Sequence, residues 1–203
     1  MTRHRTEAKP VPFADAARSL LRRTVVGAVD DLVRARGWSA TTMADVAAAA
    51  GVSRQTLYNE FGSRQALVEE YVRGEIEGML AEVEAEVRAK SDDPRRALRA
   101  AFELFLRLAS DEPVVRIIVA DTEGGELIQL LTSVGRAVAT DQVSGLVVDV
   151  WPQVSAGDAK VLAETLVRLA ISHALLPTDD PHRTAEGITR LIGPFADEVL
   201  GTA

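Results

Sequence analysis

Gln55 and Asn59 are the residues of this sequence best suited to recognise a partner through hydrogen bonds. They are four positions apart, so in a helix whose Leu57 points inward both side chains lie on the opposite, outward face. Side-chain amides can pair with the edge of adenine in the major groove of DNA, because each amide offers a donor and an acceptor. Taken alone, the short polar segment around them fits a solvated helix surface better. The surrounding sequence must decide between the two interpretations.

The sequence lacks the residue sets that catalysis or metal binding needs. It contains no cysteine, which excludes disulfide frameworks, thiolate metal sites and cysteine nucleophiles. We find no glycine-rich phosphate loop and no serine-nucleophile motif. Asp179, Asp180 and His182 crowd one segment, but Pro177 and Pro181 beside them make a turn with helix capping a simpler explanation than a metal site. We therefore expect no enzymatic activity, no metal and no cofactor.

The composition favours a helical protein with a sizeable core. The 203 residues are 47% hydrophobic, 26% charged and only 4% aromatic, so the core is built mainly from small and aliphatic side chains. No apolar run approaches the ~20 residues of a membrane-spanning helix, and the polar first residues do not resemble an export signal. We expect a soluble, cytoplasmic protein that does not bind membranes.

Charge is distributed unevenly along the chain, whose net charge is −7. Residues 1–65 carry ten Lys and Arg against six Asp and Glu, whereas residues 66–203 carry thirteen against twenty-four. A basic head of this kind can approach a polyanion while the acidic body stays away from it. Solvated protein faces also show differences of this size, so the asymmetry is compatible with a nucleic-acid partner without requiring one.

Apolar periodicity and helix-end signals predict an all-α protein, and alternating strand patterns are missing. Thr42 and Ser53 are suitable N-caps for two short helices separated by a turn at Gly51. Pro194 is expected to bend the last helix. The expected helices span residues 14–36, 43–50, 53–59, 63–90, 93–110, 113–121 and 126–151, and two more contain residues 162–173 and 188–199.

Residues 41–61, TTMADVAAAAGVSRQTLYNEF, have the pattern of a helix-turn-helix. Ala47 is small enough for the second helix to cross closely, and Val46, Val52 and Leu57 supply apolar contacts. This stretch resembles the DNA-binding head of the TetR family of bacterial transcriptional regulators. The resemblance runs from about Leu21 to Tyr71 and includes Gly37, Trp38, Thr41, Thr42, Val46, Ala47, Ala50, Gly51, Val52, Ser53, Thr56, Leu57, Tyr58, Phe61 and residues 63–67.

The resemblance implies that the second helix of the motif reads bases while residues around it contact phosphates. It assigns phosphate contacts to Thr42, Tyr58 and Arg64; Arg64 stands where Lys is more usual, and Asn59 replaces an aromatic residue or His. The expected DNA-binding residues are Thr42, Ser53, Arg54, Gln55, Thr56, Tyr58, Asn59 and Arg64. The expected domains are a flexible basic arm (1–13), a DNA-binding head (14–65) and a helical effector-binding and dimerisation body (66–203).

The resemblance and the apolar helix faces of the body together predict a ligand-responsive regulator. The simplest form is a repressor that binds a near-palindromic double-stranded DNA operator as a homodimer and is released by a small lipophilic effector. The expected effector-binding residues are Phe102, Phe105, Ile118, Leu130, Leu131 and His173, and the expected dimer-interface residues are Leu162, Leu166, Leu169, Ile188, Leu191 and Phe195.

Several alternatives remain open from the sequence alone. A filled core would explain the effector candidates nearly as well, and His173 fits a core or interface position better than a ligand contact. A helical scaffold protein without sequence-specific DNA binding, or a transcriptional activator of the same fold, would share the helical body.

Overall fold

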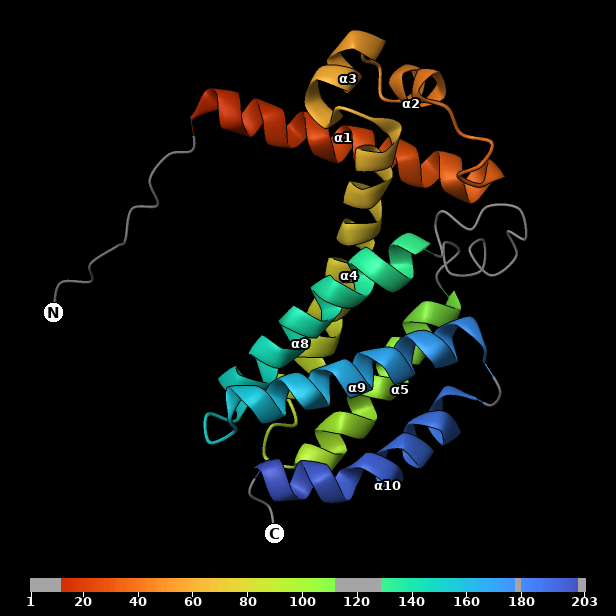
Figure 1. Cartoon of the computed structure of the whole chain (residues 1–203). Coiled ribbons are helices and arrows are strands. Elements are labelled where there is room, and N and C mark those ends of the chain that lie inside the picture. The colour runs from red at the N-terminus through yellow and green to blue at the C-terminus, as the bar shows by residue number, and fades with distance from the viewer. Residues whose placement is uncertain (1–11, 112–128, 178–179, 201–203) are drawn as a thin grey trace, which may run out of the picture.

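The computed structural model describes residues 12–111, 129–177 and 180–200, which form helices joined by turns and contain no strand. The all-α prediction is confirmed. Figure 1 shows a small head of three helices, a long helix that descends from it, and a body of helices around the lower half of that long helix. The expected helix at residues 113–121 and the arm at residues 1–11 lie outside the described residues, whereas Phe13 already belongs to the first helix.

The head consists of α1 (Phe13–Arg36), α2 (Met43–Ala49) and α3 (Arg54–Phe61). The hydroxyl of Thr42 caps α2 by accepting a hydrogen bond from the backbone N–H of Asp45, and the hydroxyl of Ser53 caps α3 by accepting one from Thr56. Gly51 lies between the two helices with φ of 68°, a conformation that suits glycine. Because these signals are local, the positions of the two short helices could be predicted from the sequence to within about two residues.

The long helix α4 (Arg64–Arg88) belongs to both parts of the molecule. Its first turns bury Leu67, Val68 and Tyr71 in the same core as Leu57 of α3, while its later turns contribute Val83 and Val87 to the core of the body. Packing therefore joins the head to the body through α4, and the expected boundary after residue 65 separates residues that share one core.

The described body contains α5 (Pro94–Asp111), a π-helical turn η1 (Leu131–Gly135), α8 (Arg136–Val150), α9 (Ala156–Leu175) and α10 (Pro181–Leu200). α10 packs mainly against α5, and α8 packs mainly against α9 and α4. The expected helix over residues 126–151 is interrupted by the π-helical turn. Pro194 lies inside α10 without ending the helix.

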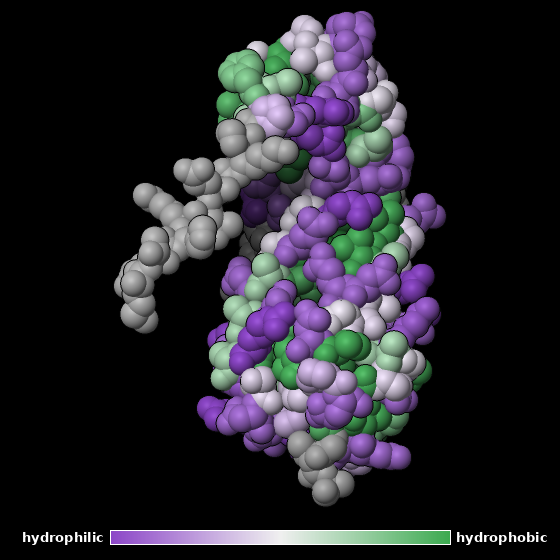
Figure 2. Space-filling model, turned by 90° about the vertical axis from the view of Figure 1, so that its left-hand side faces the viewer, coloured by the Kyte–Doolittle hydropathy of each residue, from purple (hydrophilic) through white to green (hydrophobic). Residues whose placement is uncertain are grey.

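One face of the molecule is mostly hydrophilic. Figure 2 shows polar residues over much of one face, interrupted by hydrophobic patches on the body. None of the described helices combines the length and the hydropathy that a membrane crossing requires. The exposed large hydrophobic residues include Leu191 and Phe195, both on α10.

Candidate nucleic-acid interface and internal cavity

α3 is anchored on one side and presents polar groups on the other. Leu57 and Phe61 are buried in the head core, whereas Arg54, Gln55 and Asn59 are exposed. Figure 1 places α3 at the end of the molecule farthest from the body. The expected inward and outward faces of this helix are therefore both observed, and the outward face is accessible to a large partner.

The side chains of Gln55 and Asn59 are hydrogen-bonded to each other. Gln55 Nε2 donates to Asn59 Oδ1 over 2.8 Å. This bond restricts the two exposed rotamers, and it leaves the carbonyl oxygen of Gln55 and the amide hydrogens of Asn59 as further hydrogen-bonding groups. A preordered amide pair of this kind loses less conformational entropy when it binds the edge of a base.

The one acidic residue of α3 is directed toward α1. Glu60 accepts hydrogen bonds from Arg18 Nε at 2.8 Å and from Arg22 Nη1 at 2.7 Å, and Arg22 also pairs with Glu70 of α4 at 2.9 Å. Burial acts to raise the pKa of Glu60, but the two arginines outweigh it and lower the pKa. Glu60 is thus a neutralised structural carboxylate, and the outward face of α3 carries no acidic side chain that would repel a phosphate.

The other expected contact residues surround α3. Tyr58 is exposed, Thr56 is half-buried, and its hydroxyl lies 2.8 Å from that of Ser53. Thr42 is exposed at the start of α2, where its hydroxyl donates to Asp45 Oδ2 at 2.6 Å. This hydroxyl, the Thr42 backbone N–H and Arg36 lower the pKa of Asp45 from 3.8 to about 2. Asp45 therefore stays ionised and fixes the start of α2.

Arg64 does not extend from the surface as an isolated cation. It is half-buried, and its guanidinium carbon lies 4.1 Å from the ring centroid of Trp38. Its Nη2 donates to the carbonyl of Trp38 at 2.8 Å, and its Nε donates to the carbonyl of Thr41 at 3.3 Å. No local pattern in the sequence indicates these contacts, because Arg64 is 23 positions from Thr41 and 26 positions from Trp38.

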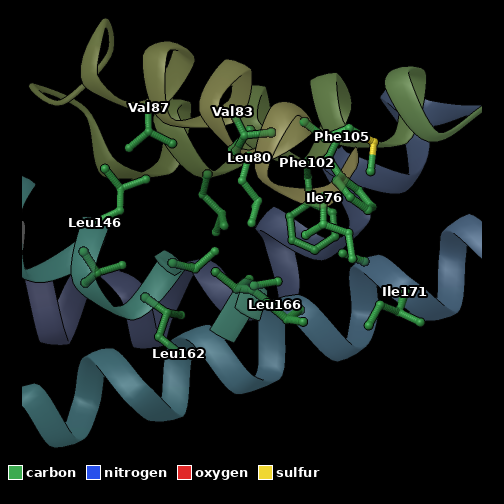
Figure 3. Close-up of a pocket in the computed structure, with 18 of the residues that line it drawn as sticks. Ile76, Leu80, Val83, Val87, Phe102, Phe105, Leu146, Leu162, Leu166 and Ile171 are labelled. Carbon is green, nitrogen blue, oxygen red and sulfur yellow. The ribbon is translucent and has the colours of Figure 1, made fainter. Parts of the chain in front are cut away.

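The body contains a partly open apolar cavity of about 150 Å³. Figure 3 shows Ile76, Leu80, Val83 and Val87 of α4 facing it from one side and Leu146, Leu162, Leu166 and Ile171 of α8 and α9 from the other, with Phe102 and Phe105 of α5 beside them. The side chains drawn there carry carbon and sulfur but neither nitrogen nor oxygen. Trp151 also lines the cavity, and its indole N–H donates to the carbonyl of Ser91 at 3.1 Å. Apolar cavities of this size stay dry and accept apolar molecules.

The effector candidates are only partly brought together by the structure. Phe102 and Phe105 line the cavity. Leu130 is instead buried in the core shared with the head, and His173 is not among the lining residues because Ala170, Ile171 and Ala174 occupy the wall at that end of α9. Ile118 lies outside the described residues, and the side chain of Leu131 is likewise not described.

Sequence reasoning missed the contribution of α4 to the cavity. Ile76, Met79, Leu80, Val83 and Val87 all line it. Their spacing follows the apolar stripe of an amphipathic helix, so the signal was present in the sequence. The effector candidates were instead sought around Phe102 and Phe105, the aromatic residues of the expected helix over residues 93–110.

Four of the six expected dimer-interface residues pack wholly or partly within their own chain, and the dimer interface stays a prediction. Leu162 and Leu166 line the cavity, Ile188 is buried in the body core, and Leu169 packs against that core. Leu191 and Phe195 remain exposed, with 76% and 37% of their surfaces accessible. The apolar stripe of α9 faces α5 and α8. There its leucines Leu162 and Leu166 form part of the cavity wall.

The segment considered as a metal site has the structure of a helix start. The Asp180 carboxylate accepts a hydrogen bond from the Arg183 backbone N–H at 3.0 Å, and His182 Nδ1 lies 3.1 Å from Glu103 Oε2. Asp179 lies outside the described residues. Capping of α10 therefore accounts for Asp180.

Comparison with known sequences identifies both parts of the chain. The family described as "Bacterial regulatory proteins, tetR family" matches residues 28–71, and "Bacterial Tetracyclin repressor, C-terminal domain" matches residues 93–194. The HTH-type transcriptional regulator AlkX of Mycobacterium tuberculosis is 36% identical over 192 residues, which cover 93% of this chain and 91% of that protein. The HTH-type transcriptional repressor KstR2 of Rhodococcus jostii is 34% identical over 92 residues, 45% of each chain.

Solved structures agree with the sequence matches. The crystal structure of the TetR family repressor AlkX from Dietzia sp., implicated in biodegradation of n-alkanes, is 35% identical and has a TM-score of 0.75. The match covers 88% of this chain and 96% of that chain. The similarity therefore extends through the head and most of the body.

Proposed function

Because the chain belongs to the TetR family and is thus a DNA-binding transcriptional regulator rather than an enzyme, we propose that it represses transcription from a near-palindromic operator. In this proposal it binds the operator as a homodimer and is released by a small lipophilic effector. Two relatives are named repressors, which supports repression over activation.

The observation that carries the proposal is the exposed Gln55 and Asn59 pair on a helix anchored by Leu57 and Phe61. With α3 in the major groove, Gln55 and Asn59 read base edges, and Arg54 supports them. Thr42 and Tyr58 contact backbone phosphates and set the orientation of the head.

A binding experiment with designed variants tests this division of roles. The operator is first selected from random duplexes by the unaltered protein. Gln55→Ala is expected to weaken operator binding by about 1–3 kcal/mol and to relax one base position, with little effect on random DNA. Gln65→Ala is the matched control, because Gln65 is also exposed and paired at i, i+4, with Glu69 at 3.0 Å, but lies on α4. Equal losses on operator and random DNA would contradict base reading by Gln55.

The proposed effector follows from the chemistry of the cavity. Its described lining offers hydrocarbon side chains, the thioether of Met79 and one indole N–H, which is already bonded within the protein. An ionised or strongly polar group inside this cavity would lose its hydration without gaining a partner. The similarity to a repressor implicated in n-alkane biodegradation supports a hydrocarbon chain as the part of the effector that enters.

Release requires the effector to bind the state with lower DNA affinity more tightly. α4 connects the two events, since it holds Leu67 and Tyr71 in the head core and Ile76 and Val83 at the cavity. We expect an n-alkane to raise the midpoint of thermal unfolding and to lower operator affinity. A short-chain diol of similar size is the control, because its hydroxyls find no partner in the cavity. An alkane that stabilises the protein but leaves operator binding unchanged would separate the cavity from regulation.

A further inference from the structure

The start of α4 is tied to the connection between α1 and α2 by a single side chain, that of Arg64. Two of its nitrogen atoms donate to two backbone carbonyls of this connection, those of Trp38 and Thr41, at 2.8 and 3.3 Å. Its guanidinium group also lies 4.1 Å from the Trp38 ring centroid. One group therefore combines two charge-assisted hydrogen bonds with a cation–π contact.

The connection that Arg64 holds is itself buried and hydrogen-bonded on its inner side. Trp38 and Thr41 are 2% and 1% exposed. The Thr41 backbone N–H donates to the carbonyl of Trp38 at 2.9 Å, and its hydroxyl donates to the carbonyl of Gly37 at 2.8 Å. The Trp38 carbonyl thus accepts from both Thr41 and Arg64, which uses both of its lone pairs.

This connection leads directly into the DNA-facing part of the head. Thr42 follows Thr41 without an intervening residue, and it is the N-cap of α2. A displacement of the Thr41 carbonyl changes the position of Thr42 relative to α3 and α4. Arg64 is therefore placed to determine where Thr42 and the start of α2 stand with respect to the rest of the head.

We propose that Arg64 is a positioning residue for DNA binding, which acts by holding the Trp38–Thr41 connection and thereby Thr42, rather than a phosphate contact. This inference rests on the proposed DNA-binding face but differs from the phosphate contact that the family resemblance implies for this position. A guanidinium group is required for it. Lysine carries the same charge but cannot place two fixed N–H groups on two carbonyls while it lies flat on the indole ring.

The substitution Arg64→Lys separates positioning from charge. A phosphate contact made through charge would survive in Arg64→Lys and would be lost in Arg64→Ala, which would also flatten the dependence of log affinity on log salt by about one unit. A positioning residue behaves otherwise. We expect both variants to lose operator affinity by about tenfold or more and both to keep the salt dependence of the parent.

Two further measurements exclude a general loss of stability. Hydrogen exchange at the Thr41 and Thr42 amides is expected to accelerate in both Arg64 variants, while circular dichroism and thermal unfolding show that the head remains folded at the assay temperature. Arg73→Lys and Arg73→Ala are the matched controls, because Arg73 is an exposed arginine on the same helix. They should leave both operator affinity and amide exchange unchanged.

The results for the two Arg64 variants test the positioning role separately from the proposed DNA-binding function. Parent-like affinity of Arg64→Lys together with the reduced salt dependence of Arg64→Ala would establish the phosphate contact and overturn the proposal. If both Arg64 variants bind the operator as tightly as the parent while their Thr41 and Thr42 amides exchange faster, the contacts of Arg64 are purely structural. That result would also overturn the proposal. If the unaltered protein selects no operator from random duplexes, the proposed function itself fails, whereas the amide-exchange result still tests the tie.

Discussion

Gly135 of the π-helical turn lies so close to Ile76 of α4 that a Cβ atom at position 135 would stand 2.5 Å from Ile76 Cδ1. Both residues line the cavity. The absence of a side chain at Gly135 therefore lets η1 approach α4 at the point where the cavity begins. This contact joins the irregular turn of the helix to the element that connects the body with the head.

Gly135→Ala is expected to destabilise the protein by only about 0.5–1.5 kcal/mol, because the methyl group displaces Cδ1, the flexible end of the Ile76 side chain, beside the cavity. Ile76→Val removes the obstructing Cδ1 atom and costs about 0.5–1.5 kcal/mol by itself. The double variant should be more stable than the sum of the two changes indicates, by about 0.5–1.5 kcal/mol in denaturant unfolding. Gly74→Ala is the control: no atom lies within 4 Å of a Cβ at that position on α4, so it should stabilise by up to about 1 kcal/mol. Strict additivity would argue against the contact.

The stability of the head is expected to fall in acid through the protonation of Asp45. Hydrogen bonds from the Thr42 hydroxyl and backbone N–H, together with Arg36, lower the pKa of Asp45 from 3.8 to about 2. Because the pKa is lowered in the folded state, its contribution to stability is complete above pH ~4 and is lost as the pH falls toward 2. The stability difference between the parent and Asp45→Asn should therefore shrink across this range in urea unfolding. Asp141→Asn on α8 controls for the change in net charge, and a difference independent of pH would contradict the prediction.

Leu191 and Phe195 of α10 are expected to form part of a homodimer interface. They remain exposed after the rest of the apolar face of α10 is buried, and one recognition helix contacts too few base pairs for selective binding. Leu191→Asp and Phe195→Asp should yield monomers with reduced operator affinity in sedimentation and binding assays. Leu20→Asp alters a comparably exposed residue, 59% accessible, on α1 and should leave the dimer intact. An unaltered protein that sediments as a monomer would exclude this interface.

The hydroxyl of Tyr71 donates to Asp30 Oδ1 over 2.9 Å and ties α4 to α1. Burial raises the pKa of Tyr71 above its ordinary value, so the hydroxyl stays protonated. Tyr71→Phe keeps the ring in place and removes this bond to a charged acceptor, so stability should fall by about 1–3 kcal/mol. Tyr58→Phe is the counterpart on the exposed face: it should leave stability unchanged and weaken binding to all DNA sequences. A loss of stability in Tyr58→Phe, together with a loss of DNA binding but not of stability in Tyr71→Phe, would show that the assigned roles are wrong.

The helices and the two faces of α3 could be predicted from the sequence because their signals are local. Thr42 and Ser53 mark helix starts through hydrogen bonds to residues three positions away, and the spacing of Gln55, Leu57 and Asn59 assigns the two faces of α3. Such interactions depend on the backbone of a single helix turn. The helical class, the head and the outward amide pair were therefore accessible without the tertiary structure.

Only the tertiary structure decided what covers each apolar face and which distant groups meet. Periodicity shows that Leu162 and Leu166 share a face of α9, but it cannot tell a cavity wall from a dimer interface, since both bury the same surface. The contacts of Arg64 with the carbonyls of Trp38 and Thr41 join positions more than twenty residues apart. Burial and contact between distant residues arise from the packing of whole helices, and no local pattern records them.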